Sequence, residues 1–140
     1  GPYAGNPLAV AAANAVFEVI EEEDLCNRAN DVGEAITARL NELANRQGME
    51  AIGDVRGLGA MVAFELVMDR ETNAPNAALA QAIVAEAEAR GLIILPCGTY
   101  GNAVRLLPPL TVPMEQVSEA MDIVEASIEA AIKSTATAAE

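Results

Sequence analysis

The residue whose type and setting most clearly indicate chemistry is Arg105, which lies in the segment 97–109 (CGTYGNAVRLLPP). It is a lone cation in an apolar, strand-like stretch that follows a loop containing two glycines. A guanidinium is permanently charged, and its planar fork can hold a carboxylate through two parallel hydrogen bonds. We therefore expect Arg105 to meet an anion. Two interpretations are open: a small carboxylate ligand, or a structural ion pair with one of the 21 acidic side chains.

Other polar residues give weaker signals. Arg56 could meet a carboxylate in a second domain, and a local ion pair fits about as well. Cys97 could be a nucleophile, but the chain has no histidine to activate its thiol, which favours a buried small side chain. Nothing in the sequence places Asp54 and Glu65 in one cleft as an acid/base pair. None of these residues is as strong a candidate as Arg105.

Composition excludes several classes of function. Eight basic and 21 acidic side chains give a net charge of −13, which argues against a nucleic-acid surface or docking on anionic lipid. Cys26 and Cys97 lie 97 − 26 = 71 positions apart and no histidine is present, so a zinc site is not expected. Two reduced thiols and the absence of an uncharged apolar stretch of about 18 residues predict a soluble, cytoplasmic domain.

Apolar periodicity predicts four helices. The first covers residues 7–23, with Asn6 as its cap and Pro7 at its first position. The second begins near Leu25 and ends before Gly48, the third covers residues 76–90, and the last runs from about 113 to 133. The expected buried faces are Leu8, Ala12, Ala15, Val16, Val19 and Ile20; Leu25, Ala29, Val32, Ile36, Leu40 and Leu43; Leu79, Ile83 and Ala87; and Val117, Met121, Val124, Ile128 and Ile132.

Four strands are expected between these helices: a short strand and turn over residues 52–59, then 60–68, 92–95 and 103–107. Residues 69–75 and 96–102 are predicted loops. The resulting order α-α-β-β-α-β-β-α predicts an α+β two-layer domain in which helices cover one face of a small, mostly antiparallel sheet. We expect residues 1–140 to form one domain, with a frayed tail over residues 134–140.

Three motifs give the chain a resemblance to a known family. Residues 3–7 (YAGNP) precede an alanine-rich helix, residues 54–61 read DVRGLGAM, and residues 97–102 (CGTYGN) are followed by 104–111 (VRLLPPLT). In this order they resemble the small C-terminal domain of class III aminotransferases, which are pyridoxal-phosphate enzymes of fold type I. The likeness is greatest to the 4-aminobutyrate aminotransferase branch, and it extends over nearly the whole chain.

The resemblance implies a role for Arg105 and an activity for a longer parent protein. Arg105 falls on the family's arginine that receives a substrate carboxylate, as in glutamate or 2-oxoglutarate. The parent would move an amino group from 4-aminobutyrate or another ω-amino acid to 2-oxoglutarate on pyridoxal phosphate. Its partners would be the large cofactor-binding domain and a dimer partner.

Two departures from the family pattern limit what this chain can do alone. Pro2 stands where the family has a threonine whose hydroxyl meets the cofactor phosphate. Lys133 is the only lysine and sits near the end of the last helix, whereas the family's Schiff-base lysine belongs to the large domain. We therefore expect no catalytic residue and no cofactor-binding residue in this chain, and no activity from it alone.

An alternative of a different class is a free-standing, non-catalytic α+β binding or interaction module. On either interpretation, a domain separated from its partner should expose apolar surface. We therefore also expect the chain to associate with itself.

Overall fold

The computed structural model describes residues 4–137, so the expectation concerning Pro2 lies outside the described residues, as do residues 138–140. Its sheet consists of β1 (Ile52–Leu58), β2 (Met61–Asp69), β5 (Ala103–Leu106) and β4 (Leu95–Cys97), side by side in the order β1-β2-β5-β4. A two-residue strand that the sequence did not predict, β3 (Ala74–Pro75), pairs with the far end of β2. Every pairing in the described residues is antiparallel.

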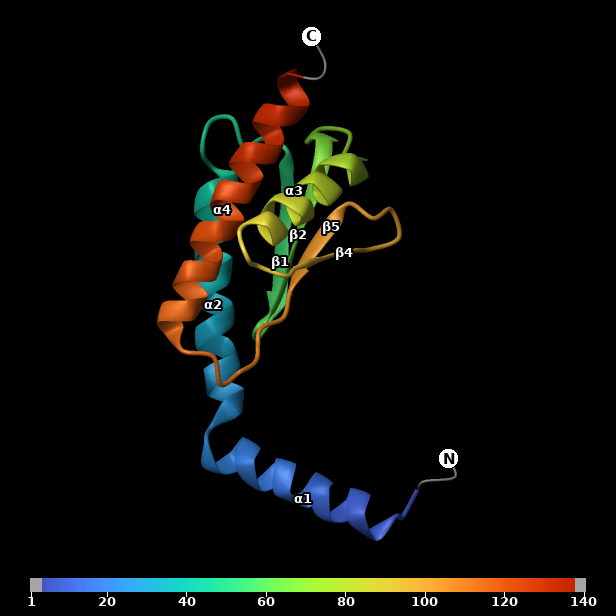
Figure 1. Ribbon diagram of the computed structural model, residues 1–140, viewed down its shortest axis with the longest axis vertical. Coiled ribbons are helices and arrows are strands. Elements are labelled where there is room, and N and C mark those ends of the chain that lie inside the picture. The colour runs from blue at the N-terminus through green and yellow to red at the C-terminus, as the bar shows by residue number, and fades with distance from the viewer. Residues whose placement is uncertain (1–3, 138–140) are drawn as a thin grey trace.

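Three of the four helices cover one face of this sheet. They are α2 (Leu25–Ala44), α3 (Ala77–Ala89) and α4 (Met114–Thr137), and Figure 1 shows them on the same side of the strands. The fourth helix, α1 (Pro7–Glu22), extends away from this body (Figure 1). The described part of the chain is thus an α+β two-layer domain, as the sequence predicted.

The core lies between the covered face of the sheet and the three helices. Strand residues alternate across a sheet, and Phe64 of β2 and Val104 of β5 both point inward and are fully buried. The helical stripes meet them as predicted, because residues three and four apart share a helix face. The buried members are Val32, Ile36, Leu40 and Leu43 of α2; Leu79, Ile83 and Ala87 of α3; and Val117, Met121, Val124 and Ile128 of α4.

The predicted helix boundaries are set by local polar groups. The Asn6 side chain accepts hydrogen bonds from the backbone N–H groups of Leu8 (3.0 Å) and Ala9 (3.3 Å) and so caps α1. Asn76 caps α3 by accepting from the Leu79 N–H at 3.0 Å. Gly91, with φ of 87°, follows the last residues of α3 and adopts the left-handed conformation common at helix ends.

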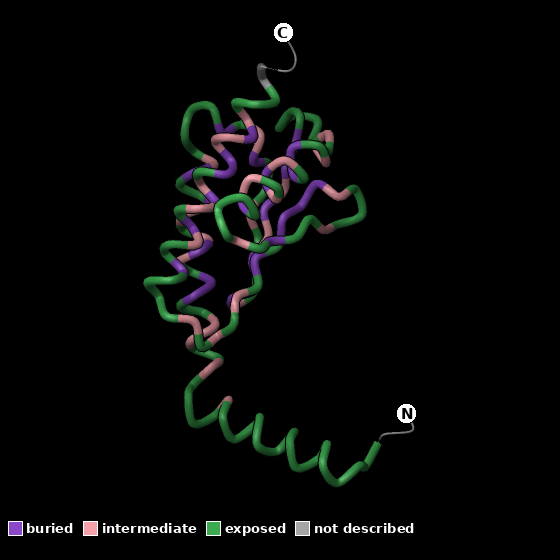
Figure 2. Tube along the Cα trace, viewed as in Figure 1, coloured by how far each residue is buried: buried purple, intermediate pink, exposed green. Residues whose placement is uncertain are grey.

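The apolar face expected for α1 is not buried, which corrects the prediction. No residue of this helix is buried, and of the six expected on its inner face only Ile20 is half-buried. Figure 2 shows the helix exposed along its length. Asp24 takes a left-handed conformation (φ 49°) between α1 and α2 and turns α1 off the domain. Within the described residues α1 contacts only α2, and most of its apolar side chains therefore stay exposed.

The strand predicted over residues 92–95 is also wrong in position. Only Ile94 of that segment is buried, and the strand that pairs with β5 covers Leu95–Cys97. Pro96, which the prediction placed in the loop 96–102, is the middle residue of β4, and β4 is an edge strand, where proline is tolerated. Cys97 faces Ala103 and is half-buried rather than buried.

The last helix continues beyond its predicted end near Lys133. α4 runs to Thr137, so residues 134–137 are helical. The remaining three residues of the expected frayed tail lie outside the described residues, and fraying there stays a prediction.

Candidate functional site

Arg105 stands on the face of the sheet that α2, α3 and α4 leave uncovered. In β5, Val104 and Leu106 are buried against the helices while Arg105 between them is exposed. Its cross-strand neighbours are Ala63 of β2 and Leu95 of β4. The strand alternation that buries the two apolar neighbours therefore presents the guanidinium to the open face.

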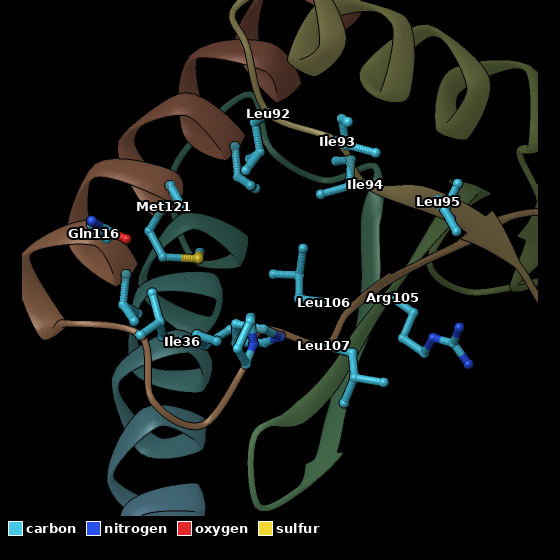
Figure 3. A pocket seen from close by; sticks show the side chains of 16 residues that line it. Ile36, Leu92, Ile93, Ile94, Leu95, Arg105, Leu106, Leu107, Gln116 and Met121 are labelled. Atoms are coloured by element: carbon cyan, nitrogen blue, oxygen red, sulfur yellow. The ribbon is translucent and has the colours of Figure 1, made fainter.

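An apolar cavity of about 500 Å³ lies on the helix side of this strand. Ile36, Leu106 and Met121 are among the side chains that line it. Arg105 contributes to its wall, but Figure 3 shows the Arg105 side chain pointing away from these three residues. The charged head of Arg105 therefore belongs to the open face and not to the apolar cavity.

The Arg105 guanidinium has no hydrogen bond or ion pair within residues 4–137, whereas each of the other six arginines is held by the chain itself. Two arginines bind backbone carbonyls: Arg28 binds those of Leu110 and Val112, and Arg70 binds four. The other four bind carboxylates: Arg39 those of Asp122 and Glu125, Arg46 those of Glu42 and Glu125, Arg56 those of Asp54 and Glu65, and Arg90 that of Glu86. The structural ion pair considered for Arg105 is therefore not formed in the described part of the chain.

Arg56 takes the local alternative that the sequence left open. Its guanidinium contacts Asp54 and Glu65, each at 2.6 Å. These hydrogen bonds, to Asp54 first and then to Glu65, raise the pKa of Arg56. Asp54 and Glu65 do come together, but around a guanidinium and not as an acid/base pair.

The loop before β5 is fixed by a residue that the sequence analysis missed. Asn102 is buried, its side-chain amide donates to the Leu66 carbonyl at 3.0 Å, and its own carbonyl accepts from the Leu66 N–H at 2.7 Å. The preceding Gly98 and Gly101 both have positive φ, which glycine adopts without strain. A polar residue directly before an apolar strand was the available signal, because a buried amide must find hydrogen-bond partners.

Among the described residues the one lysine that could bind pyridoxal phosphate is Lys133. The cofactor forms its Schiff base with a lysine. Lys133 lies near the C-terminal end of α4 (Met114–Thr137). Its side chain is 80% exposed and lies 3.9 Å from Glu129. No group of histidine, cysteine or acidic residues within the described chain could hold a metal ion.

Comparison with known proteins identifies the family. The family model for class III aminotransferases matches residues 1–128. The chain belongs to this family. A 5-aminovalerate aminotransferase of Pseudomonas putida, DavT, is 50% identical over 89% of this chain, and a 4-aminobutyrate aminotransferase of Escherichia coli, GabT, is 46% identical over 89%. This chain covers 29% of each relative, so it spans less than a third of their length.

Solved structures of aminotransferases have the same fold. A Bacillus anthracis aminotransferase matches 91% of this chain with a TM-score of 0.81 at 31% identity, and the match covers 29% of that protein. A transaminase from the marine bacterium Virgibacillus matches 95% of this chain with a TM-score of 0.83 at 29% identity, covering 30% of that protein. The two-layer domain described above therefore has the same fold as the matching part of these aminotransferases. Among its described helices, none is both long and apolar enough to cross a membrane.

Proposed function

We propose that this chain is the C-terminal domain of an aminotransferase that moves an amino group from 4-aminobutyrate, or another ω-amino acid, to 2-oxoglutarate. In this proposal Arg105 receives a substrate carboxylate. The observation that carries it is that Arg105 alone of the seven arginines has no partner within residues 4–137 while standing exposed on the open sheet face. The activities for which the two relatives are named, 5-aminovalerate and 4-aminobutyrate aminotransfer, suggest the substrate class.

The chain contributes binding, and the rest of the parent protein contributes the reaction. Pyridoxal phosphate, the cofactor of this family, would be held by a lysine of the large domain. It would supply the electron sink for transfer of the substrate's amino group. The large domain and a dimer partner are the proposed neighbours of the open sheet face. Lys133 does not replace the missing lysine, so we expect this chain alone to be inactive.

The role of Arg105 is tested in the full-length parent enzyme by Arg105→Met. A hydrogen bond to a charged group contributes roughly 1.5–3 kcal/mol, so losing the Arg105 contact should lower kcat/KM for 2-oxoglutarate about 10- to 150-fold. Arg105→Lys should recover only part of the loss, because a lysine keeps the charge but not the fork. The matched control is Arg90→Met, which removes a guanidinium that contacts Glu86 on α3. An unchanged kcat/KM in Arg105→Met would remove the proposed role.

The inactivity of the isolated chain is tested with the cofactor itself. The chain is incubated with pyridoxal phosphate, reduced with borohydride and analysed by mass spectrometry, and 4-aminobutyrate turnover is assayed in parallel. We expect no turnover. A cofactor adduct on Lys133 together with turnover would contradict the proposal.

The free-standing module remains the alternative, and the reading frame upstream of Tyr3 distinguishes the two. Roughly two further domain lengths of coding sequence, with a lysine ahead of a glycine-rich stretch, would favour the enzyme. A start codon directly upstream would favour the module.

A further inference from the structure

The open sheet face carries a second arginine in line with the first. Arg56 of β1 is the cross-strand neighbour of Ala63 in β2, and Ala63 is the cross-strand neighbour of Arg105 in β5. These two are the only arginines in the five described strands. Directly opposed residues have Cβ atoms about 4.5–5.5 Å apart. The alanine between the two arginines places only a methyl group between them.

Glu65 lies on β2, the strand between the two strands that carry the arginines. It lies two residues after Ala63 on the same strand and opposite Ala103, which makes it a diagonal neighbour of Arg105. Diagonal neighbours lie about 7–8 Å apart and are within reach of long side chains. In the structure, however, the Glu65 carboxylate is turned to β1 and bound by Arg56 at 2.6 Å.

This choice of partner leaves Arg105 without an ion pair within residues 4–137. The Glu65 side chain is 33% exposed, so leaving its carboxylate unpaired would have an electrostatic cost. Arg56 supplies the compensating charge and also binds Asp54, so the cluster carries 1 − 2 = −1. Without Arg56, Arg105 is the one cation left on the described strands with which the Glu65 carboxylate could pair.

We propose that Arg56 is a positioning residue that holds the Glu65 carboxylate away from Arg105 and thereby keeps that guanidinium open for a substrate carboxylate. The placement of Glu65 is argued from this chain's geometry alone, and only the identity of the incoming carboxylate rests on the proposed function. Removing Arg56 lets the Glu65 carboxylate pair with the Arg105 guanidinium and compete there with the substrate carboxylate. Removing Glu65 as well opens the site again.

The first experiment measures the reactivity of Arg105 in the 140-residue chain with phenylglyoxal, which modifies free guanidinium groups, and maps the products by mass spectrometry. Arg56→Gln should slow modification of Arg105 about two- to fivefold, the range expected for an exposed ion pair of up to about 1 kcal/mol. The double variant Arg56→Gln with Glu65→Gln should return the rate of Arg105 modification to that of the chain without substitutions. Asp54→Asn, which removes the other partner of Arg56, should leave the rate unchanged, as should Arg56→Lys, which keeps a cation beside Glu65.

Either of two results would overturn the proposal: an unchanged Arg105 rate in a folded Arg56→Gln chain, or a slowed rate that the double variant does not restore. Folding is checked by circular dichroism. If Arg56→Gln does not fold, Arg56→Met takes its place, and an unchanged Arg105 rate in the folded Arg56→Met chain contradicts the proposal.

The second experiment uses the full-length parent enzyme and separates this proposal from the proposed function. Arg56→Gln should raise KM for 2-oxoglutarate about two- to fivefold with kcat little changed, and adding Glu65→Gln should return KM to its original value. If Arg105→Met leaves kcat/KM unchanged, the substrate role fails while the phenylglyoxal result still decides the placement of Glu65. If Arg105→Met lowers kcat/KM but Arg56→Gln leaves KM unchanged, the positioning role of Arg56 fails.

Discussion

Gly33, in the middle of α2, shows how a single residue fixes the distance between this helix and the β1–β2 turn. An ideal Cβ at this position would lie 2.0 Å from the Gly59 carbonyl oxygen and 2.6 Å from its carbon. These are backbone atoms, so no side chain can rotate away to make room. Gly59 itself has φ of 53°, a conformation that suits the turn and that other residues adopt with strain.

We predict that Gly33→Ala destabilises the domain although alanine is the better helix former. Alanine would gain up to about 1 kcal/mol from helix propensity, but forcing the helix off the turn should cost more, giving a net loss of about 1–3 kcal/mol. Urea unfolding measures the change. Glu34→Ala, at the adjacent exposed position, is the control and should stay within about 0.5 kcal/mol of the original chain. Equal stability of both variants would contradict the close approach.

At the residue scale the sequence singled out Arg105 as a candidate but did not show its surroundings. Arg105 could be selected because a charge inside an apolar strand is unusual. The sequence could not show that it lacks a partner, since that depends on where 21 acidic side chains lie in the fold. The contacts of Arg56 depend on the β1–β2 register, which places Asp54 opposite Glu65. Sequence spacing does not specify that register.

At the scale of elements, α2 and α4 are joined by a charge network as well as by their apolar stripes. Glu125 of α4 accepts hydrogen bonds from Arg39 at 3.0 Å and from Arg46, both on the α2 side. Burial alone would raise the pKa of Glu125. The hydrogen bonds from Arg46 and then Arg39 outweigh this effect and hold the pKa of Glu125 below its ordinary value of 4.5.

This network predicts a loss of stability in acid. Because the pKa of Glu125 is lower in the folded than in the unfolded chain, its stabilisation is fully present above about pH 4.5 and is lost as the pH falls through the folded value. The free energy of unfolding should therefore decline more steeply below this pH in the original chain than in Glu125→Gln. Urea unfolding at a series of pH values measures both slopes. If the free energy of unfolding falls equally steeply with pH in both chains, Glu125 does not contribute to the loss of stability in acid.

The elements that the sequence predicted well are those whose pattern and packing agree. The stripes of α2, α3 and α4 were correct because their apolar positions repeat at helical spacing and face the sheet. α1 has an equally apolar sequence, and its existence and cap were predicted, but its burial was not, because periodicity does not reveal what a helix packs against. The shift of β4 to Leu95–Cys97 has a similar cause, since only the strand order shows that Pro96 lies on an edge.

At the scale of the whole molecule, α1 exposes more apolar surface than is usual for a domain that has no partner. Leu8 is 82% exposed and Phe17 65%, and Val10 and Val16 are also exposed. Val10 and Phe17 lie seven residues apart and so share one face of the helix. Exposed apolar surface of this kind typically marks an interaction site. We propose that in a longer parent protein a segment outside these 140 residues covers it.

In the 140-residue chain alone, a second copy is the available partner, and we predict reversible self-association through α1. The net charge of −13 opposes association by repulsion, so sedimentation should show the dimer fraction rising both with protein concentration and with added salt, which screens that repulsion. Val10→Glu combined with Phe17→Glu should keep the chain monomeric without unfolding it, because α1 has no buried residue. Asn14→Glu adds charge to the same helix without removing apolar surface and should weaken association far less. A chain that sediments as a monomer at all concentrations and salt levels would show that the α1 surface does not drive pairing.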